Sequence, residues 1–178
     1  MRNFNLLIST SRHNEINAKA ELWFLLFMMG DEFPLIFRVE FPGLFIALTN
    51  LNPKKCIEKL RKMALKNPNF FQYILKITPI EYACETDLDL IKMTVIDNFH
   101  RVIKKKETFK IQINKRNCAT SKLEIIEHIA EGLNNKVNLR KPDKIVNIEI
   151  LGNFTGISFI TKDDILSVVK EQVRIIQA

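Results

Sequence analysis

The amino-acid sequence predicts an α+β protein made of two small domains in which helices and strands alternate. The length of 178 residues suits one medium domain or two small ones. Apolar residues make up 47% and charged residues 26% of the chain, as in folded globular proteins. Along the chain, segments with strand periodicity follow segments with helix periodicity, separated by Gly and Pro turns.

The first eighty residues predict the order β-α-β-β-α-β. The expected elements are a strand at 4–9, a helix at 14–30, strands at 35–41 and 44–49, a helix at 53–67 and a strand at 70–77. Asn14 is the expected N-cap, Gly30 the helix stop, Pro42-Gly43 a turn and Pro53 the first residue of the second helix. This order is the split βαβ, or ferredoxin-like, arrangement.

The second half predicts the order α-β-α-β-β-α after a join at 78–86. The expected elements are a helix at 87–105, a strand at 108–114, a helix at 121–132, strands at 144–151 and 155–160, and a closing helix at 163–176. Ser121 and Glu124 have capping-box spacing, and Gly132 is the expected stop of that helix. The predicted domains are therefore residues 1–80, ferredoxin-like, and residues 81–178, an α/β domain.

The charge of the chain predicts an anionic partner, with nucleic acid as the first candidate. The net charge is +7. Eight Lys or Arg and one acid lie between Arg101 and Lys122, and this local excess (8 − 1 = 7) equals the net charge. Three scattered cysteines without a C-x-x-C pair predict free thiols and a cytoplasmic location. The apolar run that ends at Gly30 is too short to span a membrane, so it predicts a buried helix and no membrane partner.

The most informative stretch is residues 109–132. Its strand is expected to end near Asn114, which places Lys115 and Arg116 in a turn before the helix that starts at Ser121. A helix start presents free N–H groups and the positive end of the helix dipole, so a phosphate fits there. A second basic turn, residues 140–141, is expected to border the same surface. The candidate RNA-binding residues are Lys110, Lys115, Arg116, Lys122, Arg140 and Lys141. A loop of solvated cations is the alternative.

No motif for a nucleotide cofactor or a catalytic metal occurs, and the three histidines lie far apart in the sequence. The sequence therefore predicts no catalytic residue, no cofactor and no metal ligand.

Together these residues resemble the THUMP domain, an RNA-binding module of tRNA-modifying enzymes. The family pattern is a strand, a basic pair, a Ser at a helix start, a Val-x-Leu segment, Pro-Asp, a strand bearing Glu, a Gly and a strand with Ser. Here these are Phe109–Ile113, Lys115-Arg116, Ser121, Val137-Asn138-Leu139, Pro142-Asp143, Glu149, Gly152 and Ser158. The segment 79–84 resembles the join between the N-terminal domain and THUMP in stand-alone proteins that assist tRNA cytidine acetylation. The family's usual second Arg after the basic pair is Asn117 here.

The resemblance implies a non-catalytic tRNA-binding adaptor that works as a monomer, and the apolar run at residues 22–29 adds a weak homodimer as the alternative. Such a protein holds the acceptor stem and 3′ end of tRNA, while a separate RNA cytidine acetyltransferase uses acetyl-CoA and ATP to make 4-acetylcytidine. A second hypothesis is an RNA-binding subunit for thiolation or methylation in trans, because fold analogy does not choose the reaction. A third is a small-ligand or protein-interaction module whose cations form a solvated surface.

Overall fold

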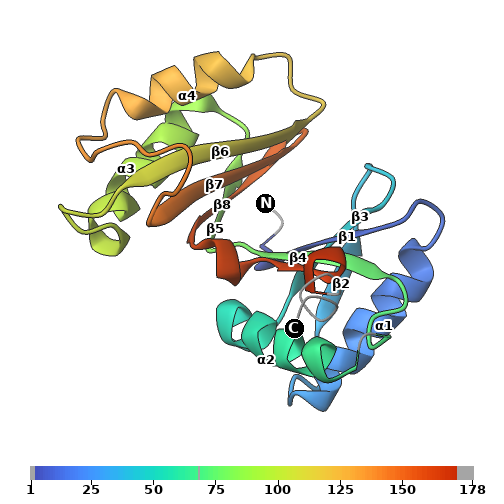
Figure 1. Cartoon of the computed structure of the whole chain (residues 1–178). Helices are drawn as coiled ribbons and strands as arrows, with labels where there is room; N and C mark the ends of the chain where they lie inside the picture. Colours follow the sequence, from blue (N-terminus) through green and yellow to red (C-terminus); the bar gives the residue numbers. More distant parts are fainter. Residues whose placement is uncertain (1–2, 68, 172–178) are drawn as a thin grey trace. The chain divides into compact units, whose positions relative to one another are not determined.

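The computed structural model describes residues 3–67 and 69–171, which form two compact units (Figure 1). The first unit contains Asn3–Ile80 together with the segment that starts at Asp163, and the second contains Glu81–Lys162. Each unit has its own sheet with helices packed on it, which confirms the α+β class. The predicted division into domains 1–80 and 81–178 concerns independent folding and stays a prediction.

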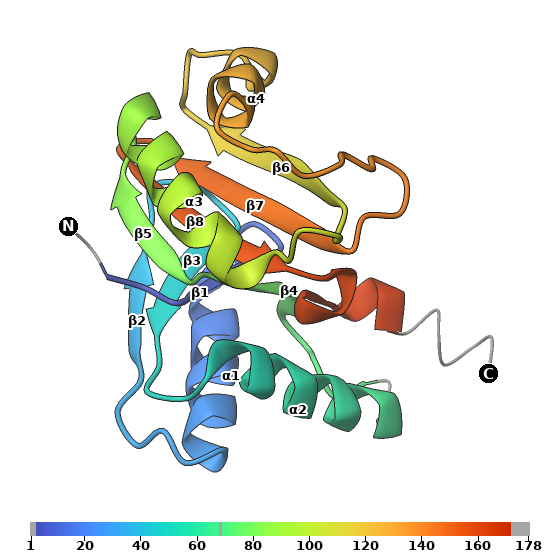
Figure 2. The same cartoon turned by 90° about the vertical axis from the view of Figure 1, so that its left-hand side faces the viewer.

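The first unit is an antiparallel sheet with two helices on the same side, as Figure 2 shows. Its elements are β1 (Leu6–Thr10), α1 (Glu15–Met28), β2 (Leu35–Arg38), β3 (Leu44–Leu48), α2 (Pro53–Lys66), β4 (Ile74–Pro79) and β9 (Leu166–Ser167). Within the described residues the strand order is β2-β3-β1-β4-β9, and every pairing is antiparallel. Strand β2 therefore forms one edge of this sheet.

Local sequence explains where these helices start and stop. The side chain of Asn52 accepts a hydrogen bond from Lys55 N (3.0 Å), and Pro53 occupies the first turn of α2, where its missing N–H is not needed. Gly30 ends α1 with a φ of 102°, a conformation that favours glycine. At Gly43 (φ 77°) a Cβ would lie 2.8 Å from Thr10 O, so a larger residue would strain this turn.

Strand β4 lies later in the sequence than predicted. Residues 70–73 were expected in the strand, but the Glu21 carboxylate of α1 accepts hydrogen bonds from the backbone N–H groups of Gln72, Tyr73 and Ile74 (2.7, 3.0 and 2.8 Å). Because these backbone groups are hydrogen-bonded to α1, the strand begins only at Ile74. The join was expected to begin at residue 78, but β4 continues through Thr78 to Pro79, which faces Leu6 of β1.

The predicted closing helix is replaced at its start by a short 3₁₀ helix (Lys162–Asp164) and by β9. Strand β9 pairs with β4, and Leu166 and Val168 are buried in the core of the first unit. Residues 168–171 are helical, and the rest of the predicted helix, 172–176, lies outside the described residues.

Helix α1 is not the buried helix that its composition predicted. Its inner side buries Ala18, Leu22, Leu25 and Leu26, whereas its outer side leaves large apolar residues exposed. Composition alone did not separate the two sides, because every residue from Leu22 to the end of the helix is apolar.

The second unit is a mixed sheet covered on one face by two helices. Its elements are β5 (Tyr82–Glu85), α3 (Leu88–Val102), β6 (Phe109–Arg116), α4 (Lys122–Ala130), β7 (Lys144–Leu151) and β8 (Phe154–Ile160). The strand order is β5-β8-β7-β6, with β6 parallel to β7 and the other pairs antiparallel. Strand β5 falls in the segment predicted as a join, where it pairs with β8.

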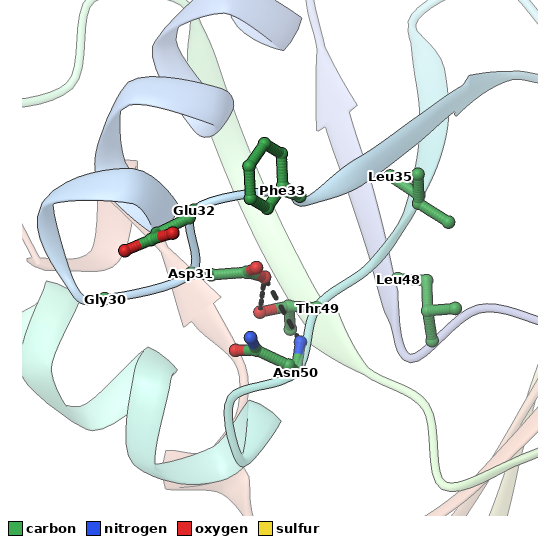
Figure 3. Close-up of a pocket in the computed structure, with 8 residues that line it drawn as sticks. All are labelled: Gly30, Asp31, Glu32, Phe33, Leu35, Leu48, Thr49 and Asn50. Atoms are coloured by element: carbon green, nitrogen blue, oxygen red, sulfur yellow. Dashed lines mark hydrogen bonds between the residues drawn. The ribbon is translucent and has the colours of Figure 1, made fainter.

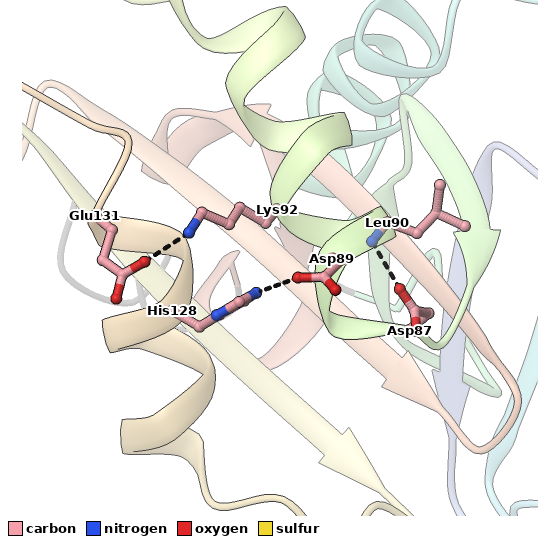
Figure 4. Close-up of polar contacts among 6 residues, drawn as sticks. All are labelled: Asp87, Asp89, Leu90, Lys92, His128 and Glu131. Atoms are coloured by element: carbon pink, nitrogen blue, oxygen red, sulfur yellow. Dashed lines mark hydrogen bonds and ion pairs between the residues drawn. The ribbon is translucent and has the colours of Figure 1, made fainter.

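Polar contacts connect α3 with α4 on their exposed side (Figure 4). Lys92 Nζ lies 2.6 Å from a Glu131 carboxylate oxygen, and His128 Nε2 lies 2.8 Å from Asp89 Oδ1. The Lys92 hydrogen bond lowers the pKa of Glu131. Both pairs are solvent-exposed in part, so they contribute little to stability, and the buried residues between helices and sheet carry most of it.

Candidate nucleic-acid interface

Strand β6 determines where the basic residues of the candidate site lie. It is the edge strand of the second sheet. Phe109 and Ile113 are buried toward the helices. Neighbouring side chains on a strand point to opposite faces, so Lys110, Gln112, Asn114 and Arg116 lie on the other face. These four residues are called the polar face of β6.

The predicted basic pair is divided by the strand. The sequence placed Lys115 and Arg116 in a turn, but β6 continues through both, with Lys115 opposite Ile150 and Arg116 opposite Leu151 of β7. The two side chains therefore point to opposite faces of the sheet. Arg116 is exposed, whereas Lys115 is half-buried. The two cations are adjacent in the sequence, but their side chains lie on opposite faces of the sheet.

The ammonium group of Lys115 is used within the protein. Its Nζ donates to the carbonyl oxygens of Cys118 (3.0 Å) and Thr120 (2.6 Å). These bonds close the loop between β6 and α4, which begins with Asn117 at a φ of 50°. Asn tolerates this left-handed conformation better than most residues. The geometry gives Lys115 a role in holding the loop.

The start of α4 has the predicted capping box. Glu124 N donates to Ser121 Oγ (3.1 Å), and Ser121 N donates to the Glu124 carboxylate (3.0 Å). The backbone N–H of Ser121, and then its side chain, lower the pKa of Glu124. A phosphate bound at this helix start would therefore share the space with a carboxylate, while Lys122 adds an exposed cation in the first turn.

A second basic group lies near the other end of β6. The backbone N–H of Asn138 donates to Phe109 O (2.9 Å). The side-chain oxygen of Asn138 accepts from the backbone N–H groups of Arg140 (3.2 Å) and Lys141 (3.0 Å). These bonds fix the turn that carries Arg140 and Lys141 beside the start of β6, close to Lys110. Both turn residues are exposed.

The six candidate residues thus form two groups. Lys115, Arg116 and Lys122 lie at the carboxyl end of β6, and Lys110, Arg140 and Lys141 lie at its amino end. Lys110 and Arg116 are six residue steps apart along the strand, which is roughly 20 Å at about 3.3 Å per step. Among residues 3–67 and 69–171, no ion-pair partner holds Arg116, Lys122, Arg140 or Lys141. These cations therefore remain available to an anionic partner.

Between the two groups runs a row of amide and carboxylate side chains, none of which is among the six candidate RNA-binding residues. Asn114 Nδ2 and Asn147 Nδ2 both donate to Glu149 Oε1 (2.8 and 3.3 Å). Asn147, Glu149 and Ser158 are buried, and Ser158 Oγ has no hydrogen-bond partner within the described part of the chain. The alternation of apolar and polar residues in 109–114 contains the signal for the part of this row that lies on β6, because every second residue there is polar.

Asp143 anchors the amino end of β6 and supplies a pH-dependent test. Thr108 donates to its carboxylate from the hydroxyl (2.7 Å) and from the backbone N–H (2.8 Å), and these bonds lower the pKa of Asp143. A lowered pKa stabilises the fold above the ordinary carboxyl range, and this contribution is lost as the pH falls through the lowered value. We expect T108V to raise the pKa of Asp143 in an NMR titration of side-chain carboxyls.

The matched control is T94V, which removes a hydroxyl that bonds within α3. It should leave the titration of Asp143 unchanged. An unchanged Asp143 titration in T108V would show that the Thr108 hydroxyl does not hold this carboxylate.

The first unit has a pocket of about 460 Å³ at the end of α1 (Figure 3). Apolar side chains of Phe33, Leu35 and Leu48 line it. The buried Asp31 carboxylate accepts from Thr49 Oγ1 (2.5 Å) and Asn50 N (3.2 Å). These bonds join the loop after α1 to the end of β3, so this carboxylate has a structural role.

Among the residues that the structure describes, no group of three or more His, Cys, Asp or Glu side chains is arranged to hold a metal ion. No helix in the same part of the chain has the length and apolarity that a membrane span requires.

The second unit is an α/β domain with a basic edge strand, and its sequence matches a known family. Residues 85–159 match the family model of the THUMP domain. No curated protein sequence matches the chain significantly.

Solved structures with a similar fold cover most of the chain. PH1313 from Pyrococcus horikoshii has a TM-score of 0.63 and 21% identity, over 88% of this chain and 54% of that one. TrmN from Thermus thermophilus has a TM-score of 0.62 and 12% identity, over 90% of this chain and 46% of that one. A 4-thiouridine synthetase, solved with RNA and bound ATP, has a TM-score of 0.58 and 15% identity, over 93% and 42%. The chain spans about half the length of these proteins, and the likeness is one of fold.

Proposed function

We propose that this protein binds tRNA and that the phosphates of the tRNA contact the two basic groups at the ends of β6. The observation that carries the proposal is the exposed, unpaired state of Arg116, Lys122, Arg140 and Lys141 within the described residues. The THUMP match and the RNA-bound 4-thiouridine synthetase of similar fold support it. Cations of this kind position the backbone of a nucleic acid and give affinity with little base specificity.

The spacing of the two groups suits a folded RNA. Groups roughly 20 Å apart meet phosphates that are several nucleotides apart in a helical stem. Recognition therefore depends on a helical stem, and preference for tRNA comes from its shape and its single-stranded 3′ end. This agrees with an interface that contacts the acceptor stem.

We further propose that the protein is a cytoplasmic adaptor that presents tRNA to a separate RNA cytidine acetyltransferase for 4-acetylcytidine formation. Its support is the resemblance of residues 79–84 and of the THUMP segment to stand-alone proteins of that type. The first unit contributes a ferredoxin-like domain in this proposal, supported by the order β2-β3-β1-β4 in its antiparallel sheet. The chain supplies affinity and register, and the partner supplies acetyl-CoA chemistry.

A second candidate is an RNA-binding subunit for thiolation or methylation in trans. The 4-thiouridine synthetase of similar fold favours thiolation within this alternative. Both candidates share the tRNA-binding step and differ in the enzyme that follows it.

The nucleosides of total tRNA from cells lacking the protein test the proposed reaction. We expect 4-acetylcytidine to disappear from tRNA, while other modified nucleosides stay at their normal levels. Re-expression of the wild-type chain should restore 4-acetylcytidine, because the acetyltransferase itself is still present in these cells. Loss of a thiolated or methylated nucleoside instead, with 4-acetylcytidine intact, would contradict the acetylation proposal and favour the second candidate.

A further inference from the structure

Helix α1 has an apolar outer face that nothing in its own unit covers. This outer face consists of Ile16, Ala20, Trp23, Phe24, Phe27 and Met28. The exposed fractions are 77% for Ile16, 44% for Trp23, 56% for Phe24, 46% for Phe27 and 65% for Met28. A helix that is apolar on all sides is normally buried on all sides. The fold buries only one side of α1, so the other side is suited to a partner.

The spacing of the outer face indicates which shape of partner fits it. Ile16, Ala20, Trp23 and Phe27 follow each other at intervals of four, three and four residues. This is the spacing of the seam between two packed helices in a coiled coil. The rings of Trp23 and Phe27 are stacked, with centroids 5.2 Å apart and planes 9° from parallel, so they form one flat surface. The partner element is therefore a helix.

The charges of α1 disfavour RNA and membrane as partners of this face. The helix contains Glu15, Lys19 and Glu21, so its net charge is −1 (1 − 2). Single-stranded RNA requires cations beside the aromatic rings, and interfacial membrane helices are rich in Lys and Arg. Neither condition is met, which leaves an apolar protein surface.

We propose that the outer face of α1 packs against the outer face of α1 in a second copy of this chain, antiparallel about a two-fold axis. The axis passes between Ala20 and Trp23, the middle of the seam. Each Trp23 then lies against Ala20 of the other copy, and each Ile16 lies against Phe27. A large side chain meets a small one at the centre, which makes the face complementary to itself.

The area of the face agrees with such a dimer. With roughly 150–250 Å² for each large side chain, these exposed fractions correspond to about 500–600 Å² per chain. Stable specific interfaces bury about 600–1,000 Å² per partner, so the outer face alone reaches only the lower limit of that range, where weak and transient interfaces lie. Phe33 and Leu35, 83% and 51% exposed, are further exposed apolar residues in the segment that follows the helix. An interface of this small area predicts a weak dimer whose formation depends on protein concentration.

Trp23 is the single tryptophan of the chain, so its fluorescence reports directly on this face. We expect the emission of the full-length, RNA-free protein to shift to shorter wavelength between about 1 and 300 µM, the range in which weak interfaces assemble. Sedimentation equilibrium on the same samples should show the mass rising from one chain toward two. Unchanged emission together with a constant monomer mass would overturn the proposal.

Two variants separate this dimer from non-specific association, with far-UV circular dichroism confirming that each is folded. F27E places a charge on the seam and should move the half-dimer concentration upward at least tenfold. The matched control M93E puts the same charge at an exposed apolar position of α3 and should leave it unchanged. A20W adds apolar area but collides with Trp23 of the other copy, so it should also weaken the dimer. Stronger association of A20W, or equal association of F27E and M93E, would overturn the antiparallel arrangement.

Discussion

Replacement of Arg116 by Glu is expected to lower the affinity for tRNA about ten- to a hundredfold while the fold survives. Hydrogen bonds to a charged group contribute about 1.5–3 kcal/mol, and the new carboxylate also repels the phosphate. Arg116 is exposed at the end of β6, and its backbone pairing with β7 does not depend on its side chain. Filter binding at one fixed salt concentration measures the change.

Two controls distinguish this contact from a general effect of charge. K59E makes the same charge change at an exposed position of α2 in the first unit and should bind like the wild type. K115M removes the ammonium that bonds two loop carbonyls, so its main effect should be a loss of stability of about 1–3 kcal/mol. Equal losses of affinity in R116E and K59E would remove Arg116 from the interface.

Replacement of Phe109 by Ala is expected to destabilise the second unit by about 3–5 kcal/mol. The Phe109 ring is buried and packs edge-on against Phe99, with centroids 4.9 Å apart. Removal leaves a cavity at the start of β6, the strand at whose two ends the basic groups lie. Because a typical domain is stable by about 5–15 kcal/mol, much of the second unit's stability would be lost, and tRNA binding with it.

Urea unfolding followed by far-UV circular dichroism measures this loss. Tryptophan fluorescence is unsuitable, since Trp23 lies in the first unit. The control L139A truncates an exposed side chain of the loop before β7 and should change stability by less than about 0.5 kcal/mol. A loss below about 1 kcal/mol in F109A would show that this site repacks without Phe109.

Local sequence patterns predicted most elements, and the differences arise where distant segments pair. Strand β6 was expected to end near Asn114 because a basic polar stretch follows. Pairing with β7 extends it to Arg116, since each added residue gains a ladder partner. Strand β9 has only two residues and pairs with β4, which lies far away in the sequence. No local periodicity can reveal such a pairing.

The candidate site was predicted in its composition but not in its arrangement. The capping box of Ser121 and Glu124 was visible as a motif and is present. Lys115 and Arg116 point to opposite faces because β6 continues through both residues. For the same reason Lys115 bonds to the loop that follows the strand. The exposed outer face of α1 depends on which side of the helix meets the sheet, and a helix that is apolar all round gives no such information.

The salt dependence of tRNA binding tests most directly whether exposed cations around β6 bind the RNA backbone. The logarithm of the association constant should fall linearly with the logarithm of salt concentration, by about 0.7–0.9 for each phosphate contacted. We expect R116E to reduce that slope by about one contact, and a variant with Arg140 and Lys141 also replaced by Glu to reduce it further. A wild-type slope near zero, or identical slopes in all three proteins, would contradict electrostatic binding at this surface.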